Sequence, residues 1–120
     1  MARCVIYARI SSRSQCWGHG IVRQIETCQH RARSDKSWVV GVYVDIASGS
    51  GGPLPQRELA IKHASQLGCP IYIEAIDRWT RSAADPTLSD DSVKLRQCAS
   101  FALECEHKLR SILETVLASK

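Results

Sequence analysis

The sequence predicts an α/β fold, with a parallel-stranded central sheet flanked by helices and followed by a C-terminal helix. Two observations support this prediction. Short apolar runs rich in β-branched residues alternate along the chain with segments whose apolar residues recur every three or four positions. These helical segments are also long enough to cross between parallel strands. A chain that alternates strand and helix in this way folds into a parallel sheet covered by helices.

Three strands are expected, at residues 4–9 (CVIYAR), 37–45 (SWVVGVYVD) and 70–76 (PIYIEAI). Polar residues follow or close each run: Ser11 comes after the first, Asp45 ends the second, and Asp77 comes after the third. The carboxyl ends of parallel strands meet at one edge of a sheet, where ligands gather. We therefore expect these polar groups to share one edge.

Helices are expected at residues 21–33 and 55–67, and Pro55 and Gly68 suit the beginning and the end of the second. The glycine- and serine-rich residues 47–53 predict a loop. Residues 92–118 carry an apolar stripe and are expected to form one helix or two. No convincing strand is predicted after Asp77.

The chain has 120 residues, which fits one domain, and 44% of them are hydrophobic and 23% charged, which argues against a disordered or membrane protein. No signal peptide is evident at the N-terminus, so we expect a cytoplasmic protein without contact to a membrane. The six cysteines form no C-x-x-C pair and are interpreted as reduced thiols. A net charge of +4 is compatible with nucleic acid as a partner.

The chemistry at the expected edge combines one serine hydroxyl with several guanidinium groups. No histidine is placed to serve Ser11 as a base, so a Ser-His-Asp triad has no support. One guanidinium group can bind two phosphate oxygens at once, and it stays charged. Catalysis of phosphoryl transfer depends mainly on positioning the reacting groups and stabilising the charge that develops. The arginines expected near Ser11 are Arg9, Arg57, Arg78 and Arg81. They favour phosphoryl transfer without a metal, and a DNA phosphodiester is one such substrate.

Four motifs in order resemble those of the serine recombinases of the resolvase and invertase type. Residues 7–12 (YARISS) resemble their opening Y-x-R-x-S motif, and Gln24 resembles the glutamine of their first helix. Residues 45–49 (DIASG) with Arg57 are similar to their D-x-x-S-G loop and its downstream arginine. Residues 76–81 (IDRWTR) are similar to their L-D-R-x-x-R motif, although Trp79 stands where a small aliphatic residue is usual.

The resemblance implies a site-specific DNA recombinase that needs no cofactor and no metal. Ser11 would attack a DNA phosphodiester to form a phosphoserine linkage, and strand exchange and religation would follow. The implied catalytic residues are Ser11, Arg9, Arg57, Asp77, Arg78 and Arg81, and the implied supporting residues are Tyr7, Gln24, Asp45 and Ser48. The family works as homodimers that pair into a synaptic tetramer. DNA binding by this chain alone is expected to be weak and non-specific.

The expected organisation is a catalytic core at residues 1–84, then a helical extension at residues 85–120 that is a candidate dimerisation helix, with no DNA-binding domain. Alternatives stay open at this stage. Ser11 could cap the following segment, and Arg9 and Arg78 could be ordinary ion-pair partners of Asp45 and Asp77. The two aspartates could instead hold Mg²⁺ in a metal-dependent phosphoesterase. The chain could also be a catalytically silent, recombinase-like remnant that acts as an interaction module.

Overall fold

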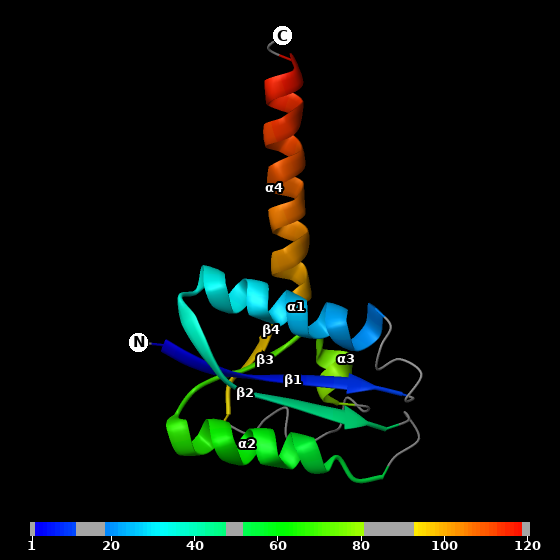
Figure 1. Ribbon diagram of the computed structural model, residues 1–120, viewed down its shortest axis with the longest axis vertical. Coiled ribbons are helices and arrows are strands. Elements are labelled where there is room, and N and C mark those ends of the chain that lie inside the picture. The colour runs from blue at the N-terminus through cyan, green and yellow to red at the C-terminus, as the bar shows by residue number, and fades with distance from the viewer. Residues whose placement is uncertain (1, 12–18, 48–51, 81–92, 119–120) are drawn as a thin grey trace.

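The structure is a computed structural model that describes residues 2–11, 19–47, 52–80 and 93–118 (Figure 1). For residues 19 and 100–108 it describes the backbone alone. Strands and helices alternate along the chain, as the sequence predicted. The elements are β1 (Ala2–Ile10), α1 (His19–Ser34), β2 (Ser37–Ile46), α2 (Pro55–Leu67), β3 (Ile71–Ile73), α3 (Ile76–Trp79), β4 (Leu95–Gln97) and α4 (Ala99–Ala118).

The centre of the fold is a four-stranded sheet in the order β2-β1-β3-β4, and every neighbouring pair of strands is parallel. Helix α1 lies on one face of the sheet and α2 on the other, and α4 extends away from the face that α1 covers (Figure 1). The predicted fold class, a parallel sheet flanked by helices with a C-terminal helix, is confirmed.

Side chains of β1 alternate between the two faces, because successive residues of a strand point to opposite sides. Val5 and Tyr7 pack in the same core cluster as Ala60 and Ala64 of α2. On the other face, Cys4 and Ile6 pack in a cluster with Cys28 and Ala32 of α1 and with Cys98. The central strand is therefore buried on both sides, and its carboxyl end is fixed relative to both helices.

The region after β3 differs from the sequence-based prediction. The expected strand at residues 70–76 is shorter in the structure, where β3 ends at Ile73. Ile76 instead begins the one-turn helix α3, which ends at Trp79. The prediction of no further strand was wrong, since β4 pairs with β3, and α4 begins at Ala99 where we expected helix from residue 92. Strand β4 escaped prediction because Leu-Arg-Gln is too short and too polar to show a strand pattern.

Two glycines fit the packing of α2. A Cβ on Gly41 of β2 would lie 2.8 Å from Nδ1 of His63 on α2, so glycine allows the helix to approach the sheet. The hydroxyl of Tyr43 contacts the same Nδ1 at 2.8 Å. Gly68 ends α2 in the left-handed conformation with φ of 65°. The contacts at His63 hold the second half of α2 against β2.

Cys4, Cys28, Cys69 and Cys98 are buried and have free thiols. Within the described parts of the chain, no helix has both the length and the apolar character that crossing a membrane requires.

Candidate active site

Arg9 lies near the carboxyl end of β1, and three elements fix it. Its backbone N–H donates to Oε1 of Gln24 at 3.1 Å, and Nε2 of Gln24 donates back to the Arg9 carbonyl at 3.0 Å. Its guanidinium donates to the carbonyl of Ala47 at 3.1 Å and to that of Asp77 at 2.7 Å. Arg9 therefore ties the ends of β1 and β2 to α3, and its planar fork has one preferred orientation.

Asp45 is the buried acceptor of the site. Its carboxylate accepts a hydrogen bond from the Tyr7 hydroxyl at 2.7 Å and from the backbone N–H groups of Gln56 and Arg57 at 3.0 and 2.9 Å. Those two N–H groups belong to the first turn of α2, whose donors have no partner within the helix. Asp45 thus caps α2 across the loop, where its negative charge also suits the helix dipole.

Tyr7 serves as a donor to that carboxylate. Burial, and then the hydrogen bond to Asp45, raise the pKa of the Tyr7 hydroxyl far above its ordinary value. The hydroxyl therefore stays protonated. The Tyr7 ring meets the ring of the buried Trp79 edge-on, with ring centroids 5.4 Å apart.

Arg57 lies in the capped first turn of α2, and its guanidinium lies over Trp79. Its Cζ is 5.4 Å from the centre of the indole ring, and its Nη1 donates to the Trp79 carbonyl at 2.9 Å. Stacking and the hydrogen bond together fix the guanidinium plane. The Trp79 ring and its carbonyl thus provide the surface and the acceptor that hold Arg57.

Arg78 lies in α3 and pairs with Glu74, with 3.6 Å between Nε and Oε1. Glu74 also accepts two hydrogen bonds from Arg23 of α1, at 2.7 Å from Nε and 3.1 Å from Nη2. The sequence analysis missed both Glu74 and Arg23. Glu74 could have been noticed, because it is a carboxylate that directly follows an apolar strand. A carboxylate buried at such a position requires a partner.

Ser11 directly follows β1 and is exposed. The strand end that precedes it is held by the hydrogen bond from the Ala47 N–H to the Ile10 carbonyl, at 2.9 Å. The side chain of Asp77 is likewise exposed. Arg81 and Ser48, both expected in the site, lie outside the described residues.

The alternatives raised by the sequence can be compared with these contacts. Arg9 donates to carbonyl oxygens and Arg78 pairs with Glu74, and these contacts differ from the ion pairs considered with Asp45 and Asp77. The oxygens of Asp45 already accept three hydrogen bonds, which makes this carboxylate a poor Mg²⁺ ligand. Among the described residues, no group of three or more His, Cys, Asp or Glu is arranged to hold a metal ion.

The chain is similar in sequence and fold to known proteins. The C-terminal catalytic domain of ISC1926 TnpA, an IS607-like serine recombinase, is 30% identical over 80% of this chain and 70% of that chain, with a TM-score of 0.66. The N-terminal catalytic domain of TP901-1 integrase is 18% identical over 93% and 98%, with a TM-score of 0.66. A resolvase family site-specific recombinase from Streptococcus pneumoniae is 19% identical over 99% and 98%, with a TM-score of 0.63.

No curated protein gives a significant match. The family model described as "Resolvase, N terminal domain" matches residues 4–110, which include the whole sheet from Cys4 onward and the larger part of α4. The chain therefore belongs to the resolvase N-terminal domain family and has the fold of a serine recombinase catalytic domain.

Proposed function

We propose that this chain is a DNA recombinase catalytic domain in which Ser11 is the nucleophile. The Ser11 oxygen would form a bond to the phosphorus of a DNA phosphodiester while the bond from phosphorus to the 3′ oxygen breaks. The hydroxyl proton leaves Ser11, and the departing oxygen gains a proton to become a 3′ hydroxyl. The product is a phosphoserine linkage to DNA. After strand exchange, the reverse reaction with a new 3′ hydroxyl religates the strand.

One observation carries the proposal. The exposed Ser11 directly follows β1, and Arg9, near the end of that strand, is held in place. Arg9 stands two residues before Ser11, and carbonyl groups from two other segments fix its guanidinium. Carbonyl oxygens carry no net charge, so they orient an arginine without neutralising it. Such a group can bind a phosphate with little loss of side-chain freedom.

The other site residues take roles that follow from their contacts or from the family resemblance. Arg57 and Arg78, together with Arg81, would bind the phosphate and stabilise the charge on the leaving oxygen. Asp77 would orient the arginines, a role supported by its carbonyl, which accepts from Arg9. Tyr7 and Asp45 support the site through the cap of α2, Gln24 supports it by holding the Arg9 backbone, and Ser48 belongs to the same loop motif.

DNA is the proposed substrate in the cytoplasm, and a second copy of the chain is the proposed protein partner. The last turns of α4 carry five apolar side chains that are each more than half exposed: Leu109, Ile112, Leu113, Val116 and Leu117. Their spacing of three and four residues forms one stripe, and two such helices can bury their stripes against each other. Dimers formed along α4 would then pair into the synaptic tetramer. Sedimentation of wild type against Leu113→Glu tests the pairing, and a wild-type monomer at high concentration contradicts it.

The chemistry is tested by mixing the purified chain with a pool of labelled DNA duplexes of randomised sequence, in the presence of a chelator. We expect a covalent protein–DNA species on a denaturing gel, with the modified peptide containing Ser11, and we expect Ser11→Ala to remove it while the fold is unchanged. An adduct that survives in Ser11→Ala contradicts the proposal. Cleavage that the chelator abolishes indicates a metal-dependent phosphoesterase, and the absence of any adduct indicates a silent interaction module.

A further inference from the structure

Glu74 is a buried carboxylate at the end of β3, where α1 and α3 meet the sheet. Its relative exposure is 8%, and its two oxygens accept hydrogen bonds from Nε and Nη2 of Arg23 at 2.7 and 3.1 Å. Two parallel hydrogen bonds between a guanidinium and a carboxylate fix the planes of both groups. Glu74 is therefore held in one orientation by a residue of a different element.

The same carboxylate reaches Arg78. Oε1 of Glu74 lies 3.6 Å from Nε of Arg78, and within the described part of the chain this buried Nε makes no hydrogen bond. Glu74 thus holds the guanidinium of Arg78 by charge at its Nε side. The terminal nitrogens of Arg78 are the ones suited to a phosphate, because paired contacts with phosphate oxygens use the outer side of the fork.

Helix α1 consequently anchors two arginines of the site through neighbouring residues. Gln24 binds both the N–H and the carbonyl of Arg9. Arg23, one position earlier, acts on Arg78 through Glu74. A shift of α1 along the sheet would therefore displace both guanidinium groups together.

We propose that Glu74, held by Arg23, is a positioning residue that orients Arg78 toward the substrate phosphate. This inference rests on the proposed function. Glu74 need not touch DNA, and its negative charge weakens the attraction of this edge for DNA. Removal of the Glu74 charge is therefore expected to slow the reaction with DNA, while the affinity for DNA stays unchanged or increases.

The first experiment compares Glu74→Gln with wild type in the rate of covalent DNA attachment and, in a Ser11→Ala background, in non-covalent DNA affinity. We expect the rate to fall about 10- to 100-fold, because small displacements of a catalytic group are costly. The affinity should stay within about twofold or increase. Glu26→Gln removes the same charge from an exposed position of α1 and should change neither quantity. An unchanged rate in Glu74→Gln, or a parallel loss of rate and affinity, overturns the inference.

A double-mutant cycle tests the path from Arg23. If Arg23 acts through Glu74, Arg23→Gln lowers the rate in the same way, and the double variant is no slower than Glu74→Gln alone. Additive losses would mean that Arg23 acts independently and would overturn that part of the inference.

A second measurement does not require a reactive chain. In wild type, the NMR signal of the Arg78 Nε–H should be resolved and should shift on titration with inorganic phosphate, and in Glu74→Gln the signal should lose its defined position and its response. An Arg78 signal that responds equally in both proteins overturns the inference. If wild type forms no adduct but the phosphate responses differ as expected, the proposed function fails while the positioning of Arg78 by Glu74 stands.

Discussion

A tyrosine donates to an aspartate at each end of the parallel sheet, both where the strands begin (the amino edge) and where they end (the carboxyl edge). The two aspartates differ in the groups that supply their other hydrogen bonds and ion pairs. At the carboxyl edge, Tyr7 donates to Asp45 at 2.7 Å, and backbone N–H groups of α2 supply the other donors. At the amino edge, Tyr72 donates to Asp35 at 2.5 Å, and arginine side chains supply the others. Backbone N–H groups hold Asp45, whereas Asp35 belongs to a network of ion pairs at the surface.

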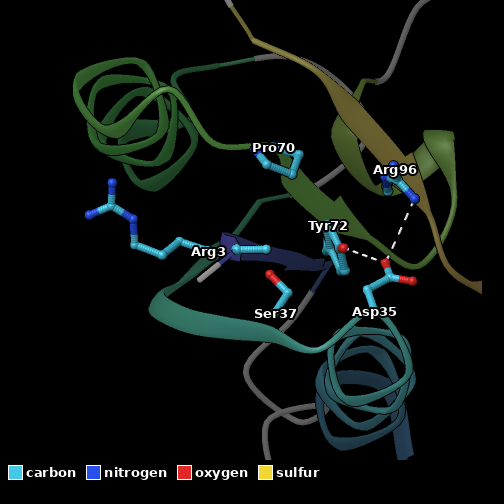
Figure 2. A pocket seen from close by; sticks show the side chains of 7 residues that line it. Arg3, Asp35, Ser37, Pro70, Tyr72 and Arg96 are labelled. Atoms are coloured by element: carbon cyan, nitrogen blue, oxygen red, sulfur yellow. Dashed lines mark hydrogen bonds and ion pairs between the residues drawn. The ribbon is translucent and has the colours of Figure 1, made fainter.

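The amino edge contains a cavity that is open to solvent. Figure 2 shows Asp35 between Tyr72 and Arg96, with the guanidinium of Arg3 directed away from them. These residues line a cavity of about 410 Å³ together with Ala2, Ser37 and Pro70. The Arg96 side chain is 51% exposed and lies 3.7 Å from Asp35, while Arg31 contacts the same oxygen at 3.1 Å. Solvent screens such pairs, and they contribute little to stability.

The comparison teaches how an arginine can be fixed and still have its charge available. At the carboxyl edge, Arg9 and Arg57 donate to backbone carbonyls, and Asp45 is occupied by backbone donors and Tyr7. At the amino edge, part of the charge of Arg96 is compensated by Asp35. We therefore expect the carboxyl edge to bind phosphate and to be the more costly edge to disrupt.

The largest expected effect is on stability. Asp45→Ala leaves a buried hydroxyl and two helix N–H groups without their acceptor, and should lower the free energy of unfolding by about 3 kcal/mol. Asp35→Ala breaks partly exposed ion pairs and the hydrogen bond from Tyr72, and should cost about 1 to 2 kcal/mol. Urea denaturation of both variants at pH 7 measures the difference. Equal losses would show that the two aspartates are held equally well.

The next effect concerns DNA affinity, measured in a Ser11→Ala background. Arg57→Gln should weaken binding about tenfold and reduce the slope of log affinity against log salt by about 0.9, because one phosphate contact is lost. Arg96→Gln removes the same charge from the amino edge and should change affinity less than about twofold. If the two variants lose affinity equally, DNA binding is a property of net charge and the carboxyl edge has no special role.

How much of this comparison the sequence predicts depends on which atoms are involved. The first three strands, the two crossover helices and the convergence of Arg9, Ser11 and Asp45 at one edge follow from side-chain patterns along the chain. The acceptors that fix Arg9 and Arg57 do not, because a backbone carbonyl is present at every residue and leaves no mark in the sequence. Likewise, Arg23 reads as one more polar residue of an amphipathic helix until the packing of α1 shows that it meets Glu74.

A smaller effect should appear at alkaline pH. Burial, and then a hydrogen bond to an aspartate, raise the pKa of both Tyr7 and Tyr72. A raised pKa in the folded state stabilises the protein below the unfolded-state pKa, about 10, and this contribution is lost as the pH rises above it. Tyr7→Phe should cost about 1 to 1.5 kcal/mol at pH 7 and should flatten the loss of stability above pH 10. Tyr72→Phe should do the same, and a profile that neither variant changes would contradict the assignment.

The smallest effect is at acidic pH and belongs to the amino edge alone. Burial raises the pKa of Asp35, but the hydrogen bonds from Tyr72 and Arg31 and the charges of Arg31 and Arg96 outweigh it, so the pKa lies below the ordinary 3.8. A lowered pKa in the folded state means that the ionised carboxylate stabilises the protein above the unfolded-state value, and that this contribution disappears as the pH falls through the folded-state value. Asp35→Asn keeps an acceptor for Tyr72 but loses the charge, so it should be less stable than wild type by about 1 kcal/mol or less at pH 7. The two unfolding curves should converge as the pH falls through the folded-state pKa of Asp35. A difference that persists there would mean that the shape of the side chain, and not its charge, holds the amino edge together.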